Sequence, residues 1–278
     1  MNTRILAVVL YLFLAASAAA ETTHSFGVLP QRSATLTAQY WNPILKYVGE
    51  KCGLKLELGV KKSAEEFSEA EAKGEFDFVF SNHIFIPDHA AAAYRVMVRA
   101  AGEPIHGQIV VPDTSAVKKL QELNGRETGF PSKNAFVAYA APMSALLLAG
   151  VTVTPVFGGN QEGVMAQLRA GSIPAAAVNS RVMKEYSARE NFRYRVLWTS
   201  EPYLEIPVAV HPRVAEPVAK AIRDALIGMS HEAEGLKMLK ASAAIIKQQG
   251  PFGFVPAQDA DYKNQREVYR ILWKKEAR

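Results

Sequence analysis

The sequence predicts an α/β fold of two lobes, each a mostly parallel sheet with helices on both faces, joined by two crossing segments. Short apolar or alternating segments are followed by helical patterns, and this order is typical of parallel sheets with crossover helices. The same alternation begins a second time near the middle of the chain. The 278 residues, 49% of them hydrophobic, suit one large or two medium domains.

The first half of the chain predicts one series of alternating strands and helices. Its expected strands are short and apolar or alternating, and lie at residues 24–30, 55–60, 76–81, 94–101 and 107–112. Helical patterns separate them at residues 36–51, 63–74 and 86–95. Gly53 follows the first helix as a C-terminal glycine does. Ser63 with Glu66 three residues later has the spacing of a capping box, and Gly74 ends that helix.

The second half of the chain repeats this pattern. We expect strands at residues 127–131, 152–157, 173–180, 194–200 and 206–212, and helices at 115–125, 132–150, 162–171 and 181–190, with a helical remainder. The crossing segments are predicted near residues 102–107 and 200–207. The first lobe is then discontinuous, residues 21–105 plus 205–278, and the second lobe covers residues 106–204.

Residues 1–20 have the pattern of a secretory signal peptide. Arg4 precedes an apolar run that ends in a small-residue cleavage site at Ala20. A retained anchor is the alternative, but the run is short for a membrane span. We therefore expect a mature protein from about Glu21 outside the cytoplasm, in the periplasm. Cys52 is the single cysteine, so no internal disulfide forms and the fold depends on burial.

The charge excludes a strongly basic surface. The formal net charge of +5 falls to +4 without Arg4, and basic residues are scattered among acidic ones. This balance argues against nucleic-acid binding and permits a weak attraction for anions.

Polar side chains follow five of the predicted strands. The carboxyl ends of parallel strands converge with helix N-termini, so ligands bind there. The candidate ligand-binding residues are hydroxyl, amide or basic: Arg32, Ser81, Asn82, His83, Ser132, Lys133, Asn134, Asn160 and Asn179. Each also has a structural interpretation, such as a helix cap for Ser132, a solvated cation for Lys133 or a packed imidazole for His83. Because polar residues of this kind follow five strands, we favour a ligand-binding site over five separate structural roles.

Motifs of catalysis and metal binding are absent from the sequence. It has no G-x-S-x-G, Walker or H-E-x-x-H motif and no paired cysteine ligands, and the six histidines lack metal-ligand spacing. Cys52 follows the first predicted helix at the far side of the sheet, where we expect a structural thiol. We expect no catalytic residue, metal or cofactor.

Several stretches resemble a known family. "FGVLPQRSATLTAQYWNPILKYVGEKCGLKLEL", "GEFDFVFSNHIF", "LNGRETGFPS", "GVTVTPVFGGN", "LRAGSIPAAAVN" and "VLWTSEPYLEIPVAVHP" look like the periplasmic substrate-binding proteins of phosphate, phosphite and phosphonate ABC transporters. The resemblance implies a type II periplasmic binding protein with a ligand cleft between its lobes. Three places differ from the family pattern: the turn is "SKNAF", Asn160 and Gln161 replace a His-Asp pair, and Asn82 and His83 replace an aromatic.

The resemblance implies a binding protein, not an enzyme, that delivers a small oxyanion to an ABC permease. We expect a monomer in which donors of the two lobes surround the anion. The alternative is a ligand-sensing subunit for a membrane histidine kinase. An extracytoplasmic enzyme on the same scaffold would need a nucleophile–base pair, whereas the strand ends offer donors.

Overall fold

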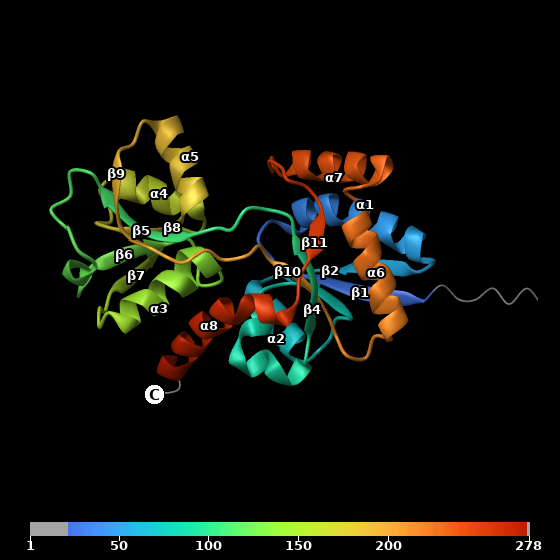
Figure 1. The fold of residues 1–278 in the computed structure, drawn as a ribbon. Helices are drawn as coiled ribbons and strands as arrows, with labels where there is room; N and C mark the ends of the chain where they lie inside the picture. The colour runs from blue at the N-terminus through green and yellow to red at the C-terminus, as the bar shows by residue number, and fades with distance from the viewer. Residues whose placement is uncertain (1–21, 277–278) are drawn as a thin grey trace, which may run out of the picture.

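The structure is a computed structural model that describes residues 22–276. The predicted signal peptide, residues 1–20, lies outside the described residues. Figure 1 shows two lobes side by side, each built on its own sheet. The two-lobed α/β architecture predicted from the sequence is confirmed.

Lobe 1 is built on a six-stranded sheet in the order β11-β4-β10-β3-β1-β2. Its strands are β1 (Thr23–Val28), β2 (Lys55–Gly59), β3 (Phe78–Phe80), β4 (Arg95–Ala100), β10 (Pro207–Val210) and β11 (Phe254–Pro256). β1 pairs with β2 and β3 in parallel, whereas β10 and β11 pair antiparallel with their neighbours. The C-terminal strands therefore complete a sheet that the N-terminal half begins.

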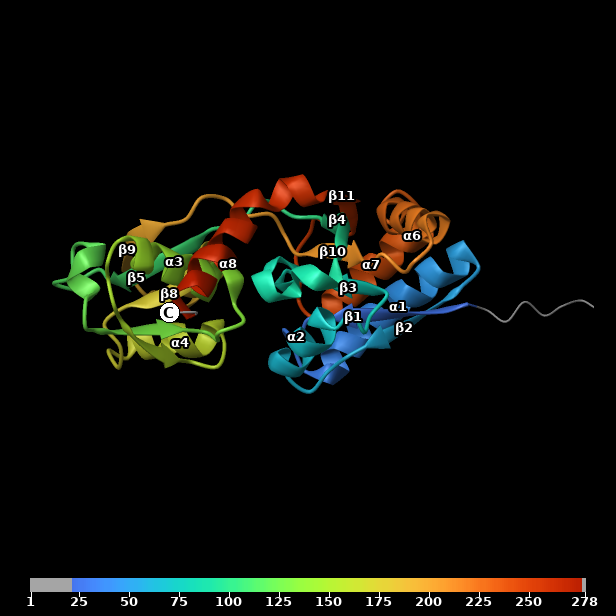
Figure 2. The ribbon, with the colours of Figure 1, turned by 90° about the horizontal axis from the view of Figure 1, so that it is seen from below.

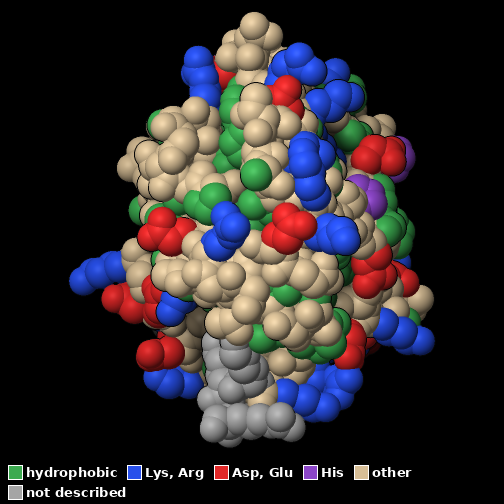
Figure 3. Space-filling view, turned by 90° about the vertical axis from the view of Figure 1, so that its left-hand side faces the viewer, with side chains coloured by type: hydrophobic (Ala, Val, Ile, Leu, Met, Phe, Trp, Pro, Cys, Tyr) green, Lys and Arg blue, Asp and Glu red, His purple; other side chains and the backbone are tan. Residues whose placement is uncertain are grey.

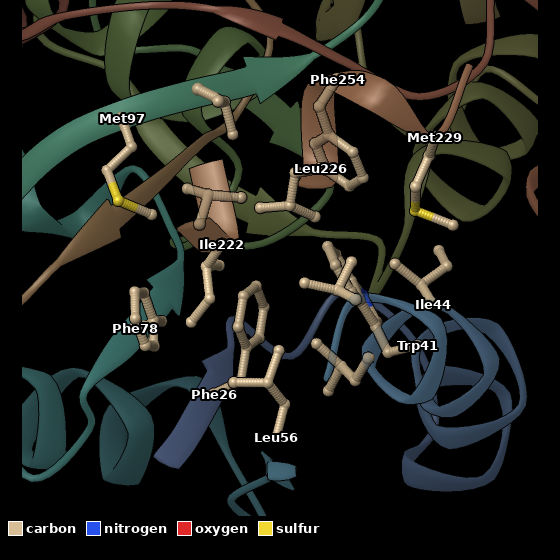
Figure 4. Close-up of a cluster of buried hydrophobic side chains, with 14 of the residues drawn as sticks. Phe26, Trp41, Ile44, Leu56, Phe78, Met97, Ile222, Leu226, Met229 and Phe254 are labelled. Carbon is tan, nitrogen blue, oxygen red and sulfur yellow. The ribbon is translucent and has the colours of Figure 1, made fainter. Parts of the chain in front are cut away.

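Helices cover both faces of this sheet. One face carries α1 (Ala34–Cys52), α6 (Glu216–Gly228) and α7 (Ala233–Ile245). Figure 4 shows the side chains between them and the strands, among them Phe26, Trp41 and Phe78. The other face carries α2 (Ala64–Ala72) and the 3-10 helices η1 (His83–Phe85), η2 (Pro87–Ala92) and η5 (Asp259–Tyr262).

The helix ends in lobe 1 follow local chemistry. The Ser33 hydroxyl accepts a hydrogen bond from the backbone N–H of Leu36 at 3.3 Å and caps α1. Gly53 ends that helix with φ +65°, a left-handed conformation that glycine adopts without strain. The Ser63 hydroxyl accepts from the N–H of Glu66 at 3.1 Å and caps α2 as the spacing predicts.

Lobe 2 is built on a five-stranded sheet in the order β7-β6-β8-β5-β9. Its strands are β5 (Gly107–Pro112), β6 (Glu127–Phe130), β7 (Thr154–Phe157), β8 (Ala176–Asn179) and β9 (Tyr194–Thr199). One face carries the 3-10 helix η3 (Leu120–Leu123), the π-helix η4 (Phe136–Ala140) and α3 (Ala141–Leu148). The other carries α4 (Gln161–Arg169) and α5 (Ser180–Glu190).

Two antiparallel crossing segments connect the lobes, one between β4 and β5 and one between β9 and β10. Ile105 and Tyr203 form a bridge in which each N–H donates to the other carbonyl at 2.9 Å. The N–H of Gly107 also donates to the Ser200 hydroxyl at 2.9 Å. These bonds hold the two segments together where the chain passes between the lobes.

The helix α8 (Lys263–Glu276) lies against both lobes, as Figures 1 and 2 show. At its start, the Tyr262 ring stacks on Phe85 of lobe 1 at 4.9 Å and its hydroxyl donates to the carbonyl of Glu205. Further along, Tyr269 contacts Phe136 of lobe 2 with ring centroids 5.4 Å apart. Helix α8 is therefore a third connection between the lobes.

Several sequence predictions are wrong in detail. The sheets are mixed rather than mostly parallel, because β10 returns antiparallel to β3 and β4 in lobe 1 and β5 runs antiparallel to β8 and β9 in lobe 2. The expected helices at residues 86–95 and 115–125 are short 3-10 turns. The helix expected at residue 132 begins at Phe136, and the expected helical C-terminus contains β11.

Candidate functional site

A cleft of about 630 Å³ lies between the lobes. Its walls come from the loops after β1 and β3, the crossing segments, the turn before η4, the starts of α4 and α5, and the segment after α7. Both lobes and both crossing segments therefore contribute to one concave site, which is the usual form of a small-molecule site.

Lobe 1 presents a cation and several polar groups to the cleft. Arg32 lies in the loop after β1, and Thr37 and Tyr40 come from the first turns of α1. Arg32 is exposed to solvent within the cleft, yet the surrounding protein lowers the pKa of its guanidinium, an effect that Tyr40 partly opposes. No carboxylate among residues 22–276 forms an ion pair with Arg32, so this cation can accept an anion from solution.

Asn82 supplies a buried polar group. It follows β3, lines the cleft and is 5% exposed, and its Oδ1 has no hydrogen-bond partner among the described residues. A buried polar atom without a partner costs free energy, about 1–3 kcal/mol. This amide can recover that cost by bonding to a ligand.

Lobe 2 faces these groups with amides at helix starts. Asn134 lies in the turn before η4, and Asn179 caps α5 by accepting from the N–H of Arg181 at 2.9 Å. The Gln161 side chain at the start of α4 accepts from the N–H of Asn179 at 3.3 Å. The starts of α4 and α5 both open onto this wall, but Asn160 and Asn179 already accept from N–H groups in their first turns, so the amide side chains rather than these backbone groups face a ligand.

The structure brings together four of the nine predicted site residues. Arg32, Asn82, Asn134 and Asn179 line the cleft. The other five do not line it: Ser81, His83, Ser132, Lys133 and Asn160. The Ser81 hydroxyl accepts from the N–H of His83 at 3.0 Å, and Asn160 caps α4 by accepting from the N–H of Gly163 at 2.9 Å. Ser132 and exposed Lys133 form the turn beside the cleft.

His83 faces the opposite lobe. It is 4% exposed, and burial, together with nearby His89, lowers its pKa to about 4, so the ring is neutral at neutral pH. The carbonyl of Asn134 and the carboxylate of Glu65 act against this shift. Its own backbone N–H and the Ser63 hydroxyl lower the pKa of Glu65, and the Asn134 side chain adds to this effect. His83 and Glu65 thus hold the lobe 2 turn from lobe 1.

Sequence reasoning missed two groups of lining residues. Residues 246–251 follow α7 and bring Lys247 to the cleft in a left-handed conformation, φ +55°. Three carboxylates also line it, those of Glu103, Glu185 and Glu205. Residues 246–251, Glu185 and Glu205 do not follow a predicted strand, so the strand-end rule could not find them, and Glu103 lies in the predicted crossing segment after the strand at 94–101, where no site residue was expected. The sequence "QQGP" at residues 248–251 could have indicated a polar loop here, because Gly-Pro interrupts a helix.

Glu205 and Arg181 are neighbours in the cleft lining. Arg181 Nη2 donates to the Glu103 carbonyl at 3.1 Å, and its Nη1 lies 3.8 Å from Glu205 Oε1. Burial raises the pKa of Glu205, and Arg181 and Arg99 oppose that rise.

The surface and the described helices set further limits. Basic and acidic side chains are interspersed on the face of lobe 2 shown in Figure 3. Among residues 22–276 no cluster of His, Cys, Asp and Glu has the arrangement of a metal site, and no helix is long and apolar enough to cross a membrane. Cys52 is half-buried at the end of α1, and burial raises the pKa of its thiol.

Comparison with known proteins gives one matching family. Residues 26–262 match the family described as ABC transporter, phosphonate, periplasmic substrate-binding protein.

Solved structures share the fold. XAC2383 from Xanthomonas citri bound to chloride ion is 15% identical, with a TM-score of 0.75 over 92% of this chain and 99% of that one. PhnD1 from Prochlorococcus marinus in complex with methylphosphonate is 15% identical, with a TM-score of 0.69 over 91% and 99%. A binding protein component of an ABC phosphonate transporter from Pseudomonas aeruginosa is 13% identical, with a TM-score of 0.66 over 92% and 87%.

Proposed function

The chain belongs to the family of periplasmic substrate-binding proteins of phosphonate ABC transporters, and we propose that its interlobe cleft captures a small phosphonate-like oxyanion through Arg32, Asn82, Asn134 and Asn179. The family consists of binding proteins without catalytic activity, so the protein is a phosphonate- or oxyanion-binding component and not an enzyme.

One observation carries the assignment of the site. Arg32 has no ion-pair partner among the described carboxylates and can donate to an anion, and it shares the cleft with Asn82, whose buried Oδ1 lacks a partner and can accept from a hydroxyl of the ligand. Arg32 and the amide donors would surround a tetrahedral anion with charge-assisted hydrogen bonds, which are stronger in a cleft where the effective dielectric constant is lower than in water. Thr37, Tyr40, Gln161 and Arg181 extend the predicted set.

Isothermal titration with a panel of oxyanions tests the function. We expect at least one phosphonate, phosphite or phosphate ligand with a Kd below about 10 µM, worth roughly 7 kcal/mol. Arg32→Ala should weaken binding about tenfold, the lower end for a hydrogen bond to a charged group, because the side chain is exposed. Arg126→Ala, an exposed cation outside the cleft, is the matched control. Absence of heat with every oxyanion would refute the proposal.

Lys133→Ala distinguishes two versions of the site. If Lys133 contacts the anion, as the sequence predicts, its loss should weaken binding as much as the loss of Arg32. Its exposed position outside the cleft lining supports a smaller effect, under about threefold, through long-range attraction that salt screens.

The proposal also covers the docking partner, the cleavage of the signal peptide and the boundaries of the lobes. We expect docking on an ABC permease, as the family supports, with a histidine kinase as the alternative partner, and a monomer in solution. We propose cleavage near Ala20, which N-terminal sequencing of the exported protein would test. The two separate sheets support lobes of residues 21–105 plus 205–278 and 106–204.

A further inference from the structure

Glu205 is held at the junction of the two crossing segments. It lies on the second segment and lines the cleft, with its side chain 23% exposed. A Cβ added to Gly102 of the first segment would lie 2.9 Å from Glu205 Cγ and 3.0 Å from its Oε1. The Glu205 side chain therefore packs closely against the backbone of the first crossing segment. Glu103 and Glu185, the other two lining carboxylates, are exposed.

A carboxylate in an anion-binding cleft opposes its function unless it has a specific task. An ionised carboxylate accepts hydrogen bonds and donates none, whereas a guanidinium donates and does not accept. Glu205 Oε1 and Arg181 Nη1 lie 3.8 Å apart, too far for a direct hydrogen bond. The cleft thus holds an acceptor-only group beside a donor-only group, with neither satisfying the other.

A singly protonated tetrahedral oxyanion matches this pair. It carries an ionised oxygen, which accepts from a guanidinium, and a hydroxyl on the same phosphorus, which donates to a carboxylate. A sulfonate of the same shape and charge has no proton to donate, so it would leave the Glu205 carboxylate facing an oxygen lone pair. Because the Glu205 side chain is only 23% exposed, a ligand that leaves it facing a lone pair is disfavoured relative to one that donates to it.

We propose that Glu205 is a specificity-determining residue that selects oxyanions bearing a P–OH group over fully ionised sulfonates, an assignment that rests on the proposed oxyanion-binding function. Arg181 is its neighbour on the lobe 2 side and receives the ionised oxygen. The ligand is therefore an organophosphonate or phosphate-like group in its singly charged form.

Methylphosphonate and methanesulfonate form the test pair, titrated calorimetrically at a pH where both carry one negative charge. The wild-type protein should prefer methylphosphonate at least about tenfold. Glu205→Gln keeps the size of the side chain but adds an N–H donor, so it should reduce this preference below about threefold, mainly by tighter methanesulfonate binding. Glu201→Gln, an exposed residue of the same segment outside the cleft, should leave the preference unchanged.

The possible outcomes separate the two proposals. Equal binding of both ligands by the wild-type protein overturns the role of Glu205 even if the variant does not fold, and so does a folded Glu205→Gln variant that keeps the wild-type preference. A preference for aminoethylphosphonate over ethylphosphonate that disappears in Glu205→Gln assigns the carboxylate to an ammonium group and overturns the P–OH assignment. Absence of binding to any phosphonate, phosphate, phosphite or sulfonate overturns the proposed function itself, and this inference with it.

Discussion

Gly107→Ala should disturb both the fold and the cleft. Gly107 opens β5 at the end of a crossing segment, and a Cβ there would lie 2.1 Å from the carbonyl oxygen of Val137. Val137 belongs to η4 and lines the cleft. Because the obstructing atom belongs to the backbone, no side-chain rotation relieves the clash, and η4 has to move away from β5.

The expected cost follows from this overlap. Overpacking of a buried site costs about 1–3 kcal/mol, and each kcal/mol lowers Tm by roughly 2–4 °C in a protein of this size. We therefore expect Tm to fall by about 2–12 °C, together with weaker oxyanion binding, because the wall at Val137 shifts.

Thermal unfolding followed by circular dichroism measures this change. Gly228→Ala is the matched control: it lies at the end of α6, where an added Cβ meets only Glu232 Oε1 at 3.7 Å. Alanine is favoured over glycine in helices, so Tm should stay or rise slightly. A Gly107→Ala variant that unfolds at the wild-type temperature would show that η4 does not pack on β5 as described.

Three further perturbations have defined outcomes. The folded-state pKa of His83, about 4, is below the usual 6.5, so the unfolded chain binds more protons and stability should fall as pH drops from 6.5 to 4; His83→Gln should flatten this slope in urea titrations at several pH values. His89→Ala should lower the free energy of unfolding in urea by about 3–5 kcal/mol, because fully buried Glu71 loses the His89 Nδ1 that lies 2.8 Å from its carboxylate. An unchanged unfolding midpoint would mean that Glu71 is protonated in the folded protein. Tyr269→Ala should remove the ring contact with Phe136, worth about 0.5–1.5 kcal/mol beyond its buried area, and increase the radius of gyration in X-ray scattering; an unchanged radius would mean that α8 does not restrain the lobes.

The fold was largely predictable because its local signals agree. Alternating apolar residues predicted the strands, and Ser63 with Glu66 predicted the start of α2. The direction of the return strand was not predictable, because β10 joins β3 and β4 only after the chain has passed through the whole of lobe 2, from β5 to β9. Local patterns carry no information about such pairing, which is decided by where the crossing segments re-enter the sheet.

The site was only partly predictable for the same reason. Strand ends located Arg32, Asn82 and Asn179, because parallel strands present their carboxyl ends to one edge. The polar run at residues 132–134 predicted a helix start, but the N–H of Ala135 donates to the Ser132 carbonyl and closes a turn instead. Glu205 could not be found because it comes before its strand, on a segment that reaches the cleft only through the crossing.

The course of α8 places the two described ends of the polypeptide on different bodies. β1 starts in the sheet of lobe 1, whereas α8 finishes beside α3 of lobe 2. A donor and an acceptor fluorophore attached at these ends would report the angle between the bodies by energy transfer, without any substitution in the interior. Solute capture could then be followed in real time on the native sequence, and any fusion partner placed after α8 would travel with lobe 2.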